Sequence, residues 1–252
     1  MPLAQIAARA LPLVDLTDLT DDCTEAAIDA LAAKAVTPHG AVAAVCVYPR
    51  FAAQAKRLLA GTGVKVATVV NFPDGGEDTE AVERETAAAL ADGADEIDLV
   101  MPYAAFMAGR HGFVETQIVR VKRLCGATTL KVILETGRLA LPETIRAAAD
   151  LALAAGADFI KTSTGKVEVN ATPEAARIML AAIRAAGSHA GFKAAGGVRT
   201  TAEAGVYLDL ADDIMGPGWA SPATMRFGAS GLLGDLLAQL GTPTTDGDHK
   251  TY

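Results

Sequence analysis

The sequence predicts an α/β protein that folds as one domain, a (β/α)8 TIM barrel, and three observations support this prediction. Eight short apolar segments alternate with longer segments whose apolar residues recur at helical spacing. Strands that alternate with helices form a parallel sheet that is buried on both faces. The length of 252 residues is typical of such a barrel. An open doubly wound sheet is the alternative, but no G-x-G-x-x-G motif follows the first apolar segment, so its dinucleotide-binding form has little support.

The eight predicted strands are spread along the chain. They cover residues 11–17, 44–49, 65–72, 95–101, 130–136, 158–164, 190–197 and 225–230. Between them, segments such as 79–94 combine Ala and Leu with charged residues at helical spacing, so we expect helices there. No linker rich in Pro, Gly or Ser divides the chain, and we expect one barrel domain over residues 1–240. Residues 241–252 lose the apolar periodicity, which predicts a flexible C-terminal tail.

Composition limits the possible partners and the compartment. The net charge is −8 and no run of basic residues occurs, so nucleic acid is not an expected partner. The apolar runs are too short to span a bilayer and no signal peptide is evident, so we expect a cytoplasmic protein without a membrane partner. Three cysteines without a C-x-x-C motif argue against a disulfide framework and a structural zinc site. An alanine-rich helical exterior suits a monomer or a homodimer.

Lys161 lies in the middle of a predicted strand, within the segment "DFIKTSTGK". Lysine is rarely buried unless it is paired. One interpretation is structural: the side chain extends to water at the barrel mouth or neutralises a carboxylate. The other is chemical, because a desolvated lysine has a lowered pKa and its free amine forms Schiff bases with carbonyl compounds. This segment alone does not decide between the two.

Two further residues favour the chemical interpretation. The segments "ADGADEIDLV" and "AAGADFIKTS" are similar, and aligning them places Asp98 on Lys161. They are the fourth and sixth predicted strands, and alternate strands of a barrel contribute to the same interior layer. Lys193 lies within the next strand, "GFKAAGG", where its positive charge would lower the pKa of Lys161. Asp98 could then relay protons.

Three glycine-containing segments follow the last predicted strands and have features of a phosphate site. Glycine lets backbone N–H groups approach an anion, and a helix N-terminus favours negative charge. Barrel enzymes often bind phosphate in the loops after strands seven and eight. Each segment alone is commonly just a turn, and "STGK" is not a Walker A loop. The candidate residues are Gly165 and Lys166 in "TGK", Gly196, Gly197 and Arg199 in "GGVR", and Ser230 in "GASG".

Several remaining residues have no predicted catalytic role. The four histidines are dispersed without metal-ligand spacing, so we expect neither a metal nor another cofactor: they are His39, His111, His189 and His249. Lys131 and Glu135 flank an apolar strand, where they could form an interior ion pair or shape the pocket. Cys46, within "AVCVYP", is typical of a small buried apolar residue.

The motifs "DFIKTSTGK", "GFKAAGGVRT", "RFGAS", "VCVYPRF" and "NFPDG" resemble those of the deoxyribose-phosphate aldolase family, over nearly the whole chain. The resemblance implies a TIM barrel that reversibly cleaves 2-deoxy-D-ribose 5-phosphate to D-glyceraldehyde 3-phosphate and acetaldehyde through a lysine Schiff base. Its partners would be small sugar phosphates and aldehydes. It also implies catalytic roles for Lys161, Lys193, Asp98 and the C-terminal Tyr252, and a phosphate site at Gly165, Lys166, Gly196, Gly197, Arg199 and Ser230.

The same resemblance implies further substrate contacts and shows two departures. Asp15, with Thr17 beside it, would lie near the substrate hydroxyls, and Cys46 would lie close enough to the site to be attacked by unsaturated aldehydes. Many relatives have proline where this chain has Ala194, and a second serine where it has Gly231, which predicts weaker phosphate binding. Two alternatives remain: a Schiff-base aldolase for another sugar, or a non-catalytic barrel that binds sugar phosphates.

Overall fold

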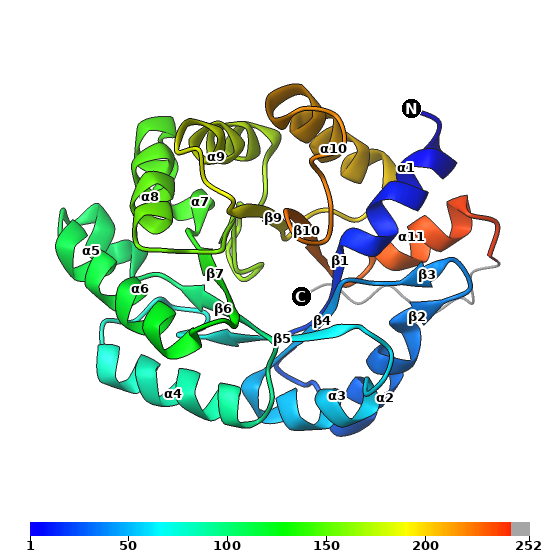
Figure 1. Cartoon of the computed structure of the whole chain (residues 1–252), viewed down its shortest axis with the longest axis horizontal. Helices are drawn as coiled ribbons and strands as arrows, with labels where there is room; N and C mark the ends of the chain where they lie inside the picture. The colour runs from blue at the N-terminus through cyan, green and yellow to red at the C-terminus, as the bar shows by residue number, and fades with distance from the viewer. Residues whose placement is uncertain (243–252) are drawn as a thin grey trace.

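The computed structural model describes residues 1–242, which form a closed barrel of eight parallel strands surrounded by helices (Figure 1). Around the barrel the strands are ordered β1-β10-β9-β8-β7-β6-β5-β4, and every neighbouring pair is parallel. The predicted TIM barrel is therefore confirmed. A two-stranded antiparallel hairpin, β2–β3, is an addition that the apolar pattern does not indicate.

Every predicted strand segment overlaps one barrel strand, and each strand is shorter than its segment. The first strand ends one residue after its segment, at Asp18, and the strand at 129–133 begins one residue before its segment. The barrel strands are β1 (Val14–Asp18), β4 (Ala44–Val47), β5 (Lys65–Val70), β6 (Glu96–Val100), β7 (Thr129–Ile133), β8 (Phe159–Lys161), β9 (Gly191–Ala195) and β10 (Met225–Ala229). The hairpin consists of β2 (Val36–Thr37) and β3 (Gly40–Ala41).

The prediction for residues 158–164 differs most, because β8 ends at Lys161. Thr162 and Thr164 are buried as expected, but their side chains bond to other segments. The Thr162 hydroxyl donates to the carbonyl of Ala195, and the Thr164 hydroxyl donates to the carboxylate of Glu135. The regular strand therefore ends at Lys161, although the backbone N–H of Thr162 still donates to the carbonyl of Lys193.

Helices surround the barrel, as Figure 1 shows. They are α1 (Leu3–Ala10), α2 (Glu25–Lys34), α3 (Ala52–Leu58), α4 (Thr79–Ala91), α5 (Tyr103–Met107), α6 (His111–Cys125), α7 (Thr136–Leu139), α8 (Pro142–Ala154), α9 (Pro173–Ala185), α10 (Thr201–Met215) and α11 (Leu232–Gln239). Short 3-10 helices span Leu11–Leu13 and Pro49–Phe51. Within residues 1–242, no helix combines the length and apolar character that crossing a bilayer requires.

Local sequence signals fix where several helices begin and end. Thr24, Asp78 and Thr172 each accept a hydrogen bond from a backbone N–H in the first turn of the following helix. Such a cap stabilises a helix by about 1 kcal/mol. Gly93 and Gly156, at φ +89° and +93°, lie between a helix and the next strand. These are the glycines in the two similar segments, and both occupy the left-handed region that favours glycine.

Candidate active site

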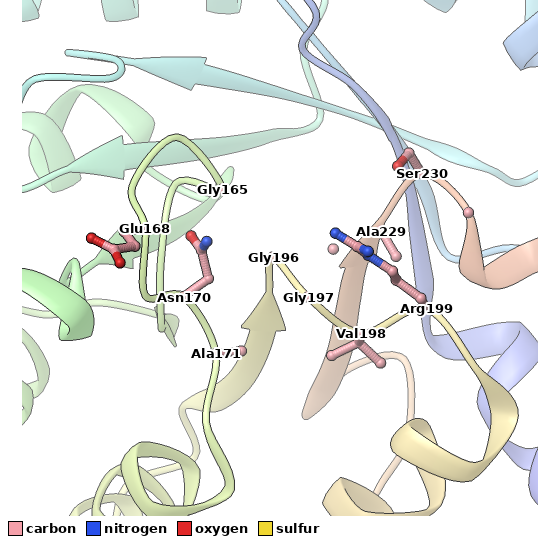
Figure 2. Close-up of a pocket in the computed structure, with 12 residues that line it drawn as sticks. Gly165, Glu168, Asn170, Ala171, Gly196, Gly197, Val198, Arg199, Ala229 and Ser230 are labelled. Atoms are coloured by element: carbon pink, nitrogen blue, oxygen red, sulfur yellow. The ribbon is translucent and has the colours of Figure 1, made fainter. Parts of the chain in front are cut away.

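A cavity of about 220 Å³ lies where β8, β9 and β10 end. Five of the six residues predicted to bind phosphate line it: Gly165, Gly196, Gly197, Arg199 and Ser230 (Figure 2). Gly196 and Gly197 have φ of +79° and +89°, a conformation that glycine adopts without strain. In Figure 2 the guanidinium of Arg199 extends toward the middle of this group, whereas the carboxylate of Glu168 points away from it.

The N-terminus of α11 also adjoins this cavity. Gly231, which lines the cavity, is the residue before the first helical turn. Backbone N–H groups at a helix start attract anions, so the helix complements Arg199. The cavity can hold a small anion such as a phosphate group.

Lys166 is not among the residues that line the cavity. Its Nζ lies 3.1 Å from Oδ1 of Asp21, and the hydroxyl of Tyr48 donates to the same oxygen at 3.2 Å. The Asp21 side chain is 91% exposed, so this ion pair is accessible to solvent. In this structure Lys166 is thus paired with Asp21.

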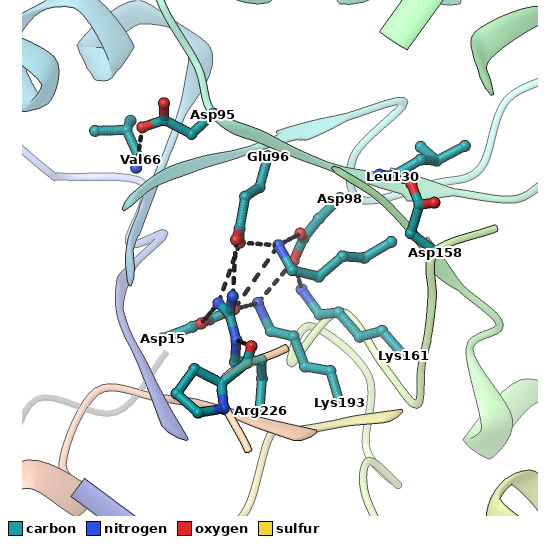
Figure 3. A network of polar contacts seen from close by, with 12 residues as sticks. Asp15, Val66, Asp95, Glu96, Asp98, Leu130, Asp158, Lys161, Lys193 and Arg226 are labelled. Atoms are coloured by element: carbon teal, nitrogen blue, oxygen red, sulfur yellow. Dashed lines mark hydrogen bonds and ion pairs between the residues drawn. The ribbon is translucent and has the colours of Figure 1, made fainter. Parts of the chain in front are cut away.

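The interior of the barrel beside this cavity contains Lys161, Lys193 and Asp98. The register of the strands explains their proximity: Lys161 pairs with Lys193 across β8 and β9, and Asp98 projects from β6. Nζ of Lys161 and Nζ of Lys193 each lie 2.8 Å from Oδ2 of Asp98, as Figure 3 shows. All three side chains are buried. The structure thus brings together the lysine pair and the carboxylate that the sequence singles out.

Electrostatics distinguishes the two lysines. Burial and the neighbouring Lys193 lower the pKa of Lys161 from its ordinary 10.5, although Asp98 opposes them. Burial also acts against the ammonium of Lys193, but Asp15 and Asp98 outweigh it and raise the pKa of Lys193 well above 10.5. Lys193 therefore stays cationic, and Lys161 is the member of the pair that more readily becomes a free amine.

Asp98 remains ionised despite its burial. Burial alone would raise the pKa of this carboxyl group, but Lys131, Lys161 and Lys193 hold it well below 3.8. Lys131 donates to Oδ1 at 2.8 Å, which leaves Oδ2 to the other two lysines. Lys131 thus forms an interior ion pair, one of the two roles considered for it, but with Asp98 and Glu96 and not with Glu135.

Glu135 supports the loop that follows Lys161. It is buried and left-handed at φ +58°, an uncommon conformation for a residue with a side chain. Its carboxylate accepts a hydrogen bond from the Thr164 hydroxyl at 2.6 Å, and burial raises the pKa of this carboxyl group. The Thr164 hydroxyl in turn accepts from the backbone N–H of Lys166. Glu135 therefore shapes the pocket, the other role that the sequence left open.

Asp15 and Thr17, which are expected near the substrate hydroxyls, both lie buried inside the barrel. Asp15 is fully buried, with one oxygen 2.5 Å from Nζ of Lys193 and the other 2.6 Å from Nη1 of Arg226. The Thr17 hydroxyl donates to the backbone carbonyl of Asp15 at 2.7 Å. Asp15 thus acts on Lys193 directly in this structure.

Cys46 is buried against a small apolar cluster that includes Leu19, Ala67 and Val69. Burial raises the pKa of its thiol, which disfavours the reactive thiolate. Tyr252 lies outside the described residues, so its predicted role stays a prediction.

Arg226 and Glu96 join this buried group, and sequence reasoning missed both. The guanidinium of Arg226 donates to the two oxygens of Glu96 at 2.8 and 3.2 Å. A usable signal existed: Glu96 precedes Asp98 by two positions on one strand, so the two side chains share a face. Arg226 likewise lies inside an apolar strand segment, where a charge requires a partner.

One glycine connects the buried lysines with the cavity. Gly228 lines the cavity, and a Cβ atom at this position would lie 2.9 Å from Cε of Lys193. The lysine side chain therefore packs directly against the β10 backbone beside the cavity. A molecule held by its anionic end in the cavity could present its other end to the lysines.

Comparisons with known proteins agree with this arrangement. Residues 9–216 match the family described as DeoC/LacD family aldolase. A deoxyribose-phosphate aldolase from Agrobacterium fabrum (strain C58) is 54% identical over 235 residues, which cover 92% of this chain and 91% of that protein.

Solved structures give the same result. A Toxoplasma gondii protein provisionally named a deoxyribose-phosphate aldolase has a TM-score of 0.88 at 28% identity, over 95% of this chain and 97% of that one. A Coccidioides immitis protein with the same provisional name has a TM-score of 0.80 at 31% identity, over 92% and 85% of the two chains. From its sequence match and its barrel with a buried lysine pair, this chain belongs to the DeoC/LacD family of aldolases.

Proposed function

We propose that this enzyme is a class I aldolase that reversibly cleaves 2-deoxy-D-ribose 5-phosphate to D-glyceraldehyde 3-phosphate and acetaldehyde, with Lys161 as the Schiff-base residue. The observation that carries the proposal is the pairing of Lys161 and Lys193 on one oxygen of Asp98. A binding site alone has no use for a buried amine of lowered pKa. A nucleophile toward a carbonyl group requires one.

The reaction begins when the free amine of Lys161 adds to the C1 aldehyde, and loss of water gives a protonated imine. The imine withdraws electrons, so the C2–C3 bond breaks as the C3 hydroxyl loses its proton. D-glyceraldehyde 3-phosphate leaves, and the electron pair of the broken bond forms an enamine. Protonation at C2 and addition of water then release acetaldehyde and regenerate the amine.

Asp98 and Lys193 have separate tasks in this scheme. Asp98 is ionised and adjoins Nζ of Lys161, so with a water molecule it relays protons to and from the C3 hydroxyl. Lys193 stays cationic and lowers the pKa of Lys161. The resemblance assigns proton transfer at C2 to Tyr252, on the predicted flexible tail over residues 241–252.

The substrate phosphate would occupy the cavity at Gly196, Gly197, Arg199 and Ser230. Lys166 would join it after leaving Asp21. Because Gly228 adjoins both the cavity and Lys193, a five-carbon sugar can place its two ends at these two positions.

The test compares turnover of 2-deoxyribose 5-phosphate with turnover of 2-deoxyribose. We expect cleavage of the phosphorylated sugar with a much higher kcat/KM, and no turnover by Lys161→Met. Preference for an unphosphorylated sugar would favour an aldolase for another substrate. Phosphate-dependent binding without any turnover by the wild-type protein would favour a sugar-phosphate sensor.

The assembly and the compartment are further parts of the proposal. A homodimer is supported by exposed apolar side chains on the neighbouring helices α1 and α10, Leu3 and Val206. Sedimentation equilibrium should then give twice the mass of one chain. A cytoplasmic location is supported by three free, buried cysteines.

A further inference from the structure

Seven buried charged side chains form one connected network inside the barrel (Figure 3). Two residues connect the lysine pair to the rest of the network. Nζ of Lys131 lies 2.6 Å from Glu96 and 2.8 Å from Asp98. Arg226 binds both Glu96 and Asp15. The members are Asp15, Glu96, Asp98, Lys131, Lys161, Lys193 and Arg226.

The charges of this network do not balance when every member is ionised. Four cations face three carboxylates, which leaves one excess positive charge. An uncompensated charge is costly when it is buried, so the network is most stable when one cation loses its proton. Arginine does not deprotonate in proteins, which leaves the three lysines.

The contacts identify Lys161 as the lysine that gives up its proton. Lys131 contacts Glu96 and Asp98, and Lys193 contacts Asp15 and Asp98. Lys161 has only Asp98, through an oxygen that it shares with Lys193. It therefore loses the least attraction on becoming neutral.

We infer that Arg226 and Glu96 are positioning residues that set the charge of Lys161 in opposite directions, through the network and without touching it. Arg226 supplies a permanent positive charge that Lys161 offsets by staying neutral. Glu96 supplies negative charge that limits this effect. The inference rests on the proposed role of Lys161 as the Schiff-base residue, and it adds two residues to the machinery.

The other titratable groups near Lys161 do not change the conclusion that Arg226 and Glu96 set its charge. Asp98 on β6, Lys193 on β9, Cys46 on β4 and Glu135 after β7 face it. Glu135 accepts its hydrogen bonds from Thr164, outside the network, and burial opposes its ionisation. Cys46 is held neutral by burial.

The single excess positive charge of the network is also consistent with imine formation at Lys161. When the neutral amine condenses with an aldehyde, one proton is taken up, one water leaves, and the nitrogen becomes a cationic imine. The excess positive charge of the network then resides on the reacting nitrogen, 2.8 Å from Asp98 in the free enzyme. A cation at that atom is what makes the imine an electron sink.

The test measures the pKa of Lys161 directly, from the pH dependence of its reaction with pentane-2,4-dione. This diketone condenses with a neutral amine and loses water to give a stable enaminone that absorbs in the near ultraviolet, and peptide mass spectrometry locates the adduct. In Arg226→Met we expect the pKa of Lys161 to rise by at least one unit. The rate below that pKa should fall about tenfold or more and recover at high pH.

Glu96→Gln should have the opposite effect, lowering the pKa of Lys161, and the double variant should return toward the wild-type profile. Arg226→Lys keeps the positive charge, so its reaction with the diketone should be close to that of the wild type and faster than that of Arg226→Met. Arg146→Gln is the matched control, because it removes one positive charge from an exposed pair with Asp150 on α8. Arg146→Gln should leave the pH dependence of the Lys161 reaction unchanged.

The outcomes separate this inference from the proposed function. If wild-type Lys161 does not react, Lys161 is not the Schiff-base residue and the proposed function is wrong. If it reacts but Arg226→Met and Glu96→Gln leave its pKa in place, or shift it in the same direction, the charge-setting role is wrong. Should Arg226→Met fail to fold, the near-isosteric Glu96→Gln decides by the sign of its shift.

Discussion

Nζ of Lys161 and Nζ of Lys193 share a single acceptor, Oδ2 of Asp98, each at 2.8 Å. Two ammonium groups on one oxygen repel each other, and the repulsion lowers the pKa of the lysine with fewer other partners. Lys193 has Asp15 as a second partner at 2.5 Å, so Lys161 is the lysine affected. This difference between neighbouring lysines underlies the proposed catalysis.

Lys193→Met should slow the reaction in a pH-dependent way. Without the neighbouring cation, Asp98 holds the proton on Lys161 more firmly, and the pKa of Lys161 rises. We expect kcat/KM at neutral pH to fall at least a hundredfold and to recover partly as the pH is raised. The pH profile of kcat/KM checks this, and an equal loss at every pH would contradict it.

The buried carboxylates should make the fold sensitive to acid. The pKa of Asp98 and that of Asp15 are lower in the folded protein than in the unfolded chain. Their contribution to stability is therefore present above about pH 4, the unfolded pKa, and is lost as the pH falls toward the folded value. Urea unfolding between pH 7 and pH 2 should show the free energy of unfolding decreasing in this range.

Asp98→Asn provides the comparison for this acid effect. Removing one partner of a buried ion pair costs about 3–5 kcal/mol, so the variant should be less stable at pH 7. Its free energy of unfolding should also change less between pH 4 and pH 2, because one titrating group is gone. Asp150→Asn on the surface should keep the wild-type slope. A slope in Asp98→Asn equal to that of the wild type would show that folding does not lower the pKa of Asp98.

Asp21 should compete with the substrate for Lys166. Asp21→Asn removes the charge that holds Nζ of Lys166 at 3.1 Å, so the lysine is free to contact the substrate phosphate. We expect KM for the phosphorylated sugar to fall severalfold, with kcat and the KM for 2-deoxyribose unchanged. Because this pair is exposed and water screens its charges, the melting temperature should hardly move. An unchanged KM would mean that Lys166 does not contact the phosphate.

Gly231→Ser should strengthen phosphate binding. Gly231 has φ −97°, so serine fits its backbone, and the added hydroxyl would lie at the start of α11 beside the cavity. A severalfold lower KM for the phosphorylated sugar is expected, with no change for 2-deoxyribose. Gly231→Ala, which adds bulk without a hydroxyl, is the control. Equal effects of both substitutions would exclude the hydroxyl as the cause.

The fold followed from the sequence because its signals are local and repeated. Eight apolar segments, glycines such as Gly93 at helix ends and caps such as Thr172 each act within a few residues. Strand ends were harder to predict, since β8 ends at Lys161 through contacts of Thr164 with Glu135, which is distant in sequence. The hairpin β2–β3 lacks any apolar pattern and was not predicted.

The candidate site was predictable where two signals coincided. Lys161, Lys193 and Asp98 are charges inside apolar strands, and the similar segments relate two of them. Arg226 and Glu96 are also charges inside apolar strands, but no second signal accompanies them. Nothing in the sequence reveals that they bind each other across the barrel. The contact of Lys166 with Asp21 also joins residues distant in the chain, so the sequence alone did not indicate it.

Reductive trapping tests the central claim most directly. The protein is incubated with 2-deoxyribose 5-phosphate or acetaldehyde, reduced with sodium borohydride, digested and mapped by mass spectrometry. The account predicts one covalent adduct on Lys161, of the mass expected for the reduced imine, with loss of activity in proportion to the adduct. An adduct on Lys193 or Lys131 in place of Lys161, or turnover without any adduct, would contradict it.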